Sequence, residues 1–270
     1  MIDHAHALDR YEAGASPVHA LDARVKVALT VLFALSCALL PDGSWAAFAA
    51  SWVLVLALGI ASGLGAGYAP RRSVVALPFA LAGLSALVAV PGRPLAQFAV
   101  GPWDLVATDA GLVRFASILA RGWLSVQMAA LLAATTAWPD LLHALGHLRV
   151  PPPIVGTISF MARYLAVLAD EADRLLRARD ARSARRPGAR AGGSVAWRAR
   201  TAGHMAGHLF LRATERSERV YQAMLARGFR GQLLTQDAHR LRPADRVVGL
   251  AAVLVLGLIQ VAARMGWPRP

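Results

Sequence analysis

Two short triplets centred on arginine are the residues of this sequence whose types and spacing point most directly to chemistry. They are Ala181-Arg182-Ser183 and Ala226-Arg227-Gly228. An arginine side chain carries a permanent charge on a planar fork of donors that fits carboxylates and carbonyl oxygens. The small residues beside it allow another protein to approach the backbone closely. One such arginine could simply complete the negative end of a helix dipole, but two in the same setting predict docking into partner proteins.

Each triplet follows a long stretch with a helical pattern of apolar residues. Apolar side chains recur at spacings of three or four from Ile154 onward, which predicts a helix over 154–180. A second helix is predicted over 194–225, with Gly228 just beyond its end, where a left-handed glycine is common. The segment 184–193 is rich in arginine and glycine and is expected to be a linker. These two amphipathic helices are expected to form a cytoplasmic coupling domain over 140–240.

The rest of the chain has the composition of a membrane protein. Of its 270 residues 56% are hydrophobic and only 17% are charged, against roughly 25% charged in soluble domains. The fold class is therefore expected to be all-α, a polytopic membrane protein with an N-terminal membrane domain over 1–139 and a final membrane helix and tail over 241–270. About five runs are long and apolar enough to cross a bilayer. They are 25–41, 44–62, 74–90, 112–137 and 247–263.

The basic residues predict how the chain is oriented in the membrane. Alternate connections between these spans carry 24 basic residues on one side and 3 on the other. Because cytoplasmic connections hold the excess of Lys and Arg, the N-terminus and the coupling domain are expected in the cytoplasm. The C-terminus of this multi-pass protein is expected outside the cell (inner) membrane. The net charge of +13 then reflects topology, and no nucleic-acid partner is expected.

Two arginines, Arg114 and Arg121, lie within or beside the fourth predicted span. They are seven residues apart and so share one helix face. An ionisable residue in a membrane segment is a candidate functional residue by default. The alternative is structural: Arg114 extends to the outer surface and Arg121 pairs with a neighbouring helix.

Several other functions lack the residues they need. Lys26 is the only lysine and does not stand in a P-loop, so the chain is expected neither to bind ATP by that motif nor to be an enzyme. The pairs His143/His147 and His204/His208 have a spacing that can hold a metal, but each lacks a third ligand. We therefore expect no metal site and no cofactor. An intramembrane enzyme would need a nucleophile elbow or an acidic dyad, and neither is present. A stand-alone secondary transporter remains an alternative, although no inverted repeat supports it.

The paired arginine triplets resemble those of a known family, the transmembrane T components of energy-coupling factor (ECF) transporters. Other stretches resemble the same family along nearly the whole chain. The Asp-Arg-Tyr opening most resembles its cobalt and nickel branch, known as CbiQ or NikQ. The matching stretches are 9–11, 16–26, Thr135-Thr136, 148–151 and 159–164.

This resemblance implies a role and a set of partners. A T component is a scaffold that joins two cytoplasmic ATPase subunits to a small membrane-embedded S component that binds the substrate. Arg182 and Arg227, with their flanking residues, would each dock into one ATPase, and ATP-driven closure would tilt the S component. The cobalt and nickel branch implies an S component of the CbiM or NikM kind and leaves open a small accessory membrane subunit. A vitamin-type ECF importer is the alternative.

Overall fold

The protein, seen as a computed structural model, is described over residues 11–76, 83–100, 103–148, 150–182, 194–231 and 241–265. These residues fall into two compact units. The first, here called the core unit, comprises the described residues of Arg10–Ala144 and His239–Pro270. The second, here called the helix-pair unit, comprises those of Leu145–Ala238. The helix-pair unit is thus inserted into the sequence of the core unit.

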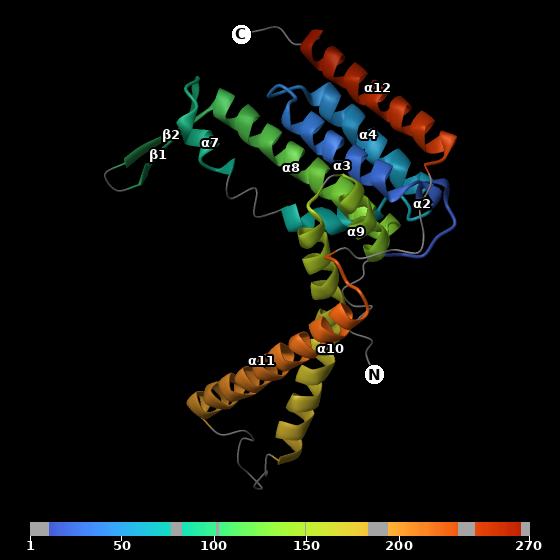
Figure 1. Cartoon of the computed structure of the whole chain (residues 1–270). Coiled ribbons are helices and arrows are strands. Elements are labelled where there is room, and N and C mark those ends of the chain that lie inside the picture. Colours follow the sequence, from blue (N-terminus) through green and yellow to red (C-terminus); the bar gives the residue numbers. More distant parts are fainter. Residues whose placement is uncertain are drawn as a thin grey trace. The chain divides into compact units, whose positions relative to one another are not determined.

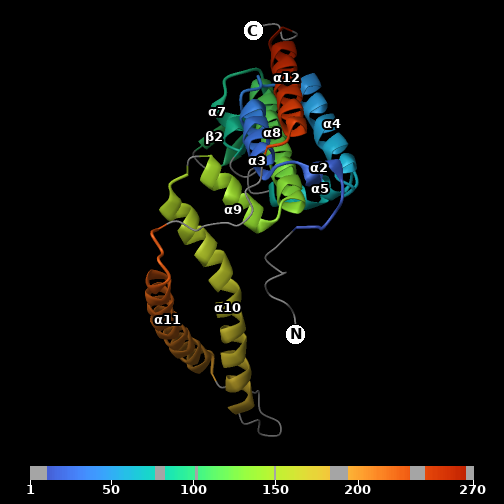
Figure 2. The same ribbon diagram turned by 45° about the vertical axis from the view of Figure 1, so that its right-hand side comes forward.

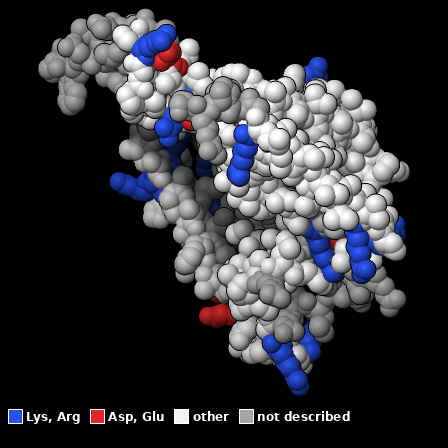
Figure 3. All heavy atoms as spheres, turned by 90° about the horizontal axis from the view of Figure 1, so that it is seen from above, with Lys and Arg blue, Asp and Glu red and all other residues white. Residues whose placement is uncertain are grey.

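Four helices lie side by side in the core unit (Figures 1 and 2). They are α3 (Ala23–Ala38), α4 (Trp45–Ala61), α8 (Asp109–Thr135) and α12 (Pro243–Met265). Helices α3 and α12 begin at the end of the unit where α8 finishes. From the side on which α12 ends, the described surface is mainly uncharged, with separate Lys and Arg side chains (Figure 3). At 1.5 Å per residue, α3 is only about 24 Å long and α8 is about 40 Å long.

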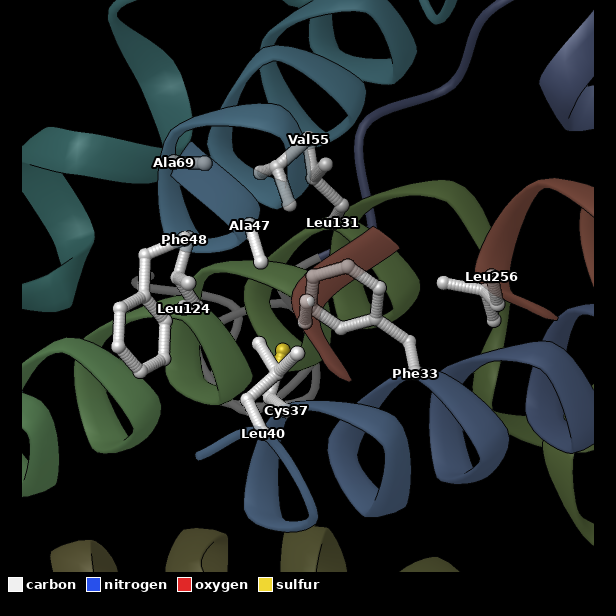
Figure 4. Packing of buried hydrophobic residues seen from close by; sticks show 11 residues of the cluster. Phe33, Cys37, Leu40, Ala47, Phe48, Val55, Ala69, Leu124, Leu131 and Leu256 are labelled. Carbon is white, nitrogen blue, oxygen red and sulfur yellow. The ribbon is translucent and has the colours of Figure 1, made fainter. Parts of the chain in front are cut away.

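Apolar side chains from these four helices and from the short helix α5 (Tyr68–Arg72) form the core of the unit. Figure 4 shows how they interdigitate. Many other large apolar side chains on the same helices point outward and are exposed, such as Leu35, Val53 and Leu254. A helix that is apolar on every side is typical of a lipid environment. The buried members are Phe33, Cys37, Leu40, Ala47, Phe48, Val55, Ala69, Leu124, Leu131, Leu256 and Ala263.

The third predicted span, 74–90, is not a continuous helix where it is described. Its start belongs to a 3₁₀ turn, η1 (Ser73–Ala76), and its end to a single helical turn, α7 (Ala86–Ala89). Residues 77–82 lie outside the described part. Both described ends of the segment nevertheless lie against α8. η1 and α7 each contact α8, and the Thr108 hydroxyl, just before α8, donates to the Val90 carbonyl at 2.7 Å. A crossing at this place in the chain stays a prediction.

A small antiparallel hairpin precedes α8. Strands β1 (Pro94–Val100) and β2 (Trp103–Thr108) pair with Phe98 opposite Leu105 and Val100 opposite Trp103. The sequence had predicted no strand here. The fold class is still confirmed as a helical polytopic membrane protein, because the hairpin is the single sheet among the residues described.

Within the described part of the chain, three helices are long and apolar enough to cross a membrane by length and composition, namely α8, α12 and α10 (Pro152–Arg182), and α4 is a shorter apolar helix. The presence of α10 in this group differs from expectation, since the sequence pattern places it outside the bilayer. Its first half is apolar, whereas eight of the thirteen residues from 170 to 182 are charged. The two halves of α10 therefore favour different environments, the first apolar and the second aqueous.

The helix-pair unit consists mainly of α10 and α11 (Val195–Ala226), preceded by α9 (Trp138–His147), which joins it to the core unit. The two long helices begin and end within two residues of the predicted positions. Ser194 caps α11, its hydroxyl accepting from the Trp197 amide at 3.2 Å. The helices cross, and α10 ends away from the end at which α11 finishes (Figure 1).

Candidate functional site

Arg182 is the last residue of α10, and its side chain is exposed. Prolines occupy the first turn of this helix. Backbone N–H groups in a first turn have no partner within the helix, so prolines cost no hydrogen bond there. The helix continues two residues past the predicted end, so Ala181 and Arg182 are helical, and Ser183 lies outside the described residues. The neighbouring Arg179 pairs with Asp180, Nη2 to Oδ1 at 2.7 Å. Among the residues that are described, no acidic side chain pairs with Arg182.

Arg227 stands at the end of α11 in a well-defined C-terminal cap. Gly228 has a φ of +83°, its N–H donates to the Leu225 carbonyl at 2.9 Å, and the Phe229 N–H donates to the Met224 carbonyl at 3.0 Å. This is the Schellman arrangement, in which a left-handed residue ends the helix. The prediction that Gly228 occupies this position is confirmed. The cap fixes the backbone of Arg227 while its side chain stays exposed.

Three large apolar side chains on α11 are exposed. Phe210, Tyr221 and Leu225 are 70%, 49% and 44% exposed. They lie eleven and four residues apart, close to whole numbers of turns, so they share one face. The face predicted from the sequence, which includes Met205 and Leu209, is partly covered instead. Exposed aromatic residues and arginines are both typical of protein interfaces.

An ion-pair cluster joins α10 and α11 where they cross. The Glu171 carboxylate on α10 accepts from Arg212 on α11 at 2.5 Å and from Arg174 on its own helix at 2.6 Å. The hydrogen bond from Arg212 is the main cause that lowers the pKa of the Glu171 carboxyl, and Arg174 adds to it. Sequence analysis missed this pair, because residues 41 positions apart carry no local signal of contact.

The two arginines of the fourth predicted span both lie near one carboxylate. Arg121 donates to Asp42 Oδ1 and to the Leu40 carbonyl, each at 2.6 Å. Arg114 is farther away, with Nε 3.9 Å from Asp42 Oδ2. Between them on the same face, the buried Ser117 hydroxyl accepts from the Gly43 amide at 2.9 Å. The arrangement holds the loop between α3 and α4 against α8, which supports a structural role for both arginines.

The histidine pairs do not form a metal site in the described residues. There, no group of three or more His, Cys, Asp and Glu side chains is placed to hold an ion. His143 instead lies 3.3 Å from a guanidinium nitrogen of Arg24.

With this geometry in view, comparison with known proteins is decisive. The family model of CbiQ, described as a cobalt transport protein, matches residues 14–237. The chain belongs to the CbiQ family. It is also 28% identical over 271 residues to the energy-coupling factor transporter transmembrane protein EcfT of Thermosediminibacter oceani, which covers 96% of each chain. This CbiQ-family chain is therefore a multi-pass T component of an ECF transporter, a membrane subunit and not itself the ATPase.

Sequence analysis missed one further group of polar residues in the core unit. Asp22, Lys26 and Asp245 are charged yet buried where α3 and α12 begin. The sequence did draw attention to the stretch 16–26, as part of the resemblance, but not to Asp245. A buried charge needs partners, and their identity became visible only in the fold.

Proposed function

We propose that this chain is the coupling subunit of an ATP-driven ECF importer. Two cytoplasmic ATPase subunits would bind the helix-pair unit, one at Arg182 and one at Arg227. A membrane-embedded S component would carry the substrate. Closure of the ATPases on ATP would move α10 and α11, and this movement would reorient the S component so that substrate is released inward.

The observation that carries this proposal is the pair of exposed arginines at the ends of α10 and α11. Each stands at the end of a long helix, and the two helix ends lie apart (Figure 1), which suits two separate partners. Tyr221 and Leu225 add exposed apolar surface in the last two turns of the same helix. Aromatic residues and arginine are the residue types that carry most binding energy in interfaces. The triplets are therefore suited to grooves that offer carboxylates or carbonyl oxygens.

The proposal places the helix-pair unit in the cytoplasm and the C-terminus outside. Its support is the large excess of basic residues in the segment from Arg149 to Arg246. The charged second half of α10 adds to it, because charged side chains at the centre of a bilayer are costly. The apolar first half, including exposed Ile154, Met161 and Leu165, would then face the S component or the membrane interface.

The substrate that we propose is a cobalt or nickel ion. Its support is the description of the matched family as a cobalt transport protein. The ion would be bound by an S component of the CbiM or NikM kind, with or without a small accessory membrane subunit. The EcfT relative carries no metal in its name, so a vitamin remains the competing substrate.

The test compares two matched double variants in the complete complex. Arg182→Ala/Arg227→Ala removes charge-assisted hydrogen bonds worth roughly 1.5–3 kcal/mol apiece, and up to about 5 kcal/mol where a partner charge is left unpaired. Arg177→Ala/Arg200→Ala removes two exposed arginines from the bodies of the same helices. We expect the first variant to lose ATPase co-purification and ATP-driven uptake, and the second to keep both.

Two results would contradict the proposal. If the Arg182/Arg227 double variant assembles and transports like the parent, the triplets are ordinary helix ends. If the chain alone transports substrate in liposomes without ATP, it is a secondary transporter. Uptake of radiolabelled cobalt and nickel, with a vitamin in competition, identifies the substrate in the same preparation.

A further inference from the structure

A buried charge cluster lies at the end of the core unit where α3 and α12 begin. Asp22, Lys26 and Asp245 are only 7%, 8% and 3% exposed. Asp22 and Lys26 belong to the start of α3, whereas Asp245 belongs to the start of α12. Burying charges costs free energy that their contacts must offset, so the contacts of these three residues carry the interpretation.

Lys26 connects the start of α3 to the end of α8. Its ammonium donates to the carbonyl of Thr135, the last residue of α8, at 2.8 Å, and to the carbonyl of His19 at 3.1 Å. The last carbonyls of a helix lack partners within it and carry the negative end of its dipole. A buried ammonium there holds the end of α8 firmly. Nearby, Arg24 contacts His143 on α9.

Asp245 connects the start of α12 to the start of α3. One carboxylate oxygen accepts from the Arg242 amide at 2.8 Å, and the other accepts from the Asp22 amide at 3.3 Å. Asp22 is the N-cap of α3, with its own carboxylate accepting from the Arg24 amide at 2.8 Å. Unpaired amides at helix starts favour a carboxylate. A single aspartate thus ties two helix starts together.

These contacts lie close in sequence to both points where the chain passes between the units. The core unit is left after Ala144 and re-entered at His239. Thr135 and His143 precede the exit by few residues, and Arg242 and Asp245 follow the re-entry closely. The stretch from His19 to Lys26 makes hydrogen bonds both to the residues before the exit and to those after the re-entry. It therefore joins the two covalent connections of the helix-pair unit to each other through the beginning of α3.

We infer that Asp22, Lys26 and Asp245 form a clasp that fixes both connections of the helix-pair unit to the core helices. With the clasp closed, a displacement of the helix-pair unit moves α8 and α12 together with α3. Without it, α3, α8 and α12 are no longer joined at this end of the core unit, and the displacement is not passed on to all three helices. The three residues are positioning residues. This inference rests on the proposed coupling function, because it assumes that the ATPases move α10 and α11.

The test measures substrate transported per ATP hydrolysed in the complete complex. Lys26→Met keeps the length of the side chain and removes the ammonium, and Asp245→Asn removes the charge and places donors opposite a backbone amide. We expect both variants to assemble and to hydrolyse ATP, while transport per ATP falls between about twofold and thirtyfold. Lys26→Arg keeps a cation and donors, and should retain most of the ratio.

The matched control is Asp42→Asn, which weakens the ion pairs with Arg114 and Arg121 farther along the same core unit. It should lower stability without changing transport per ATP. An unchanged ratio in the Lys26 and Asp245 variants overturns the clasp. So does the loss of both variants from the membrane while Asp42→Asn is recovered, since the cluster would then serve folding alone. Failure of the proposed function itself is distinguishable, because the parent complex would then show no ATP-dependent uptake.

Discussion

The guanidinium of Arg121 donates to the carboxylate of Asp42 at 2.6 Å, although the two residues are 79 positions apart. The same nitrogen also donates to the Leu40 carbonyl at 2.6 Å. Through this contact α8 holds the loop that follows α3. An arginine inside a membrane segment is thereby paired with a carboxylate of the protein, as the cost of its charge requires.

The two arginines of α8 are expected to differ in their effect on stability. Arg121 is 23% exposed and makes two short bonds, so Arg121→Gln should lower the free energy of unfolding by about 1–3 kcal/mol. Arg114 is 56% exposed and 3.9 Å from Asp42, so Arg114→Gln should cost at most about 1 kcal/mol. Thermal unfolding of the purified chain in detergent measures both. Equal effects of the two variants would contradict this assignment.

The lowered pKa of Glu171 predicts how the crossing of α10 and α11 responds to pH. The hydrogen bond from Arg212 favours the charged carboxylate, so the carboxyl should titrate below its ordinary value of about 4.3. The contribution of the pair is then complete above that value and is lost as pH falls through the lowered pKa. A titration of isotopically labelled Glu171 in detergent measures the midpoint. Arg212→Gln should raise it, and an unchanged midpoint would refute the pairing.

Replacement of Gly228 should weaken the cap that presents Arg227. With φ at +83°, an alanine there is strained by about 1–2 kcal/mol, whereas asparagine tolerates this conformation better. We expect ATPase co-purification to decrease in the order glycine, asparagine, alanine at this position. As a control, Gly207→Ala in the body of α11, where a Cβ meets nothing within 4 Å, should leave co-purification intact. A loss with Gly207→Ala equal to that with Gly228→Ala would show that the cap is not the cause.

Accessibility of single cysteines distinguishes the two interpretations of α10. In a Cys37→Ser background, a cysteine replacing the exposed Arg177 should react with an impermeant thiol reagent from the cytoplasmic side only. A reporter fused after the last residue should be active only outside. If α10 crosses the bilayer, position 177 will be modified from the outside instead, and the proposed orientation of the helix-pair unit will fail.

Local signals allowed the two long helices to be predicted almost to the residue. Prolines at 151–153 mark the start of α10, and Gly228 marks the end of α11 through a conformation that glycine adopts at little cost. The spacing of apolar residues also identified the partly covered face of α11. This signal is local too, because it depends on residues three and four positions apart. The positions of Arg182 and Arg227 at helix ends followed directly.

Contacts between distant residues could not be predicted in this way. Lys26 and Thr135 are 109 positions apart, and Asp22 and Asp245 are 223 apart. Only the packing of α3 against α8 and α12 brings them together. The hairpin at 94–108 was likewise missed. Its pairing depends on hydrogen bonds between two strands, which cannot be inferred from the number of apolar residues in a segment. The same count suggested one helix over 74–90, where the described ends are short turns.

The unequal lengths of α3 and α8 have a consequence for the surrounding lipid. A helix of 16 residues, about 24 Å, is shorter than the roughly 30 Å of a bilayer's hydrocarbon layer, whereas 27 residues exceed it. The bilayer therefore has to thin beside α3 and α4, or these helices must recruit a neighbour that covers their ends. Hydrophobic mismatch of this kind gives the subunit a thin side and a thick side. The thickness of the lipid bilayer then influences which of these two sides a neighbouring membrane protein occupies.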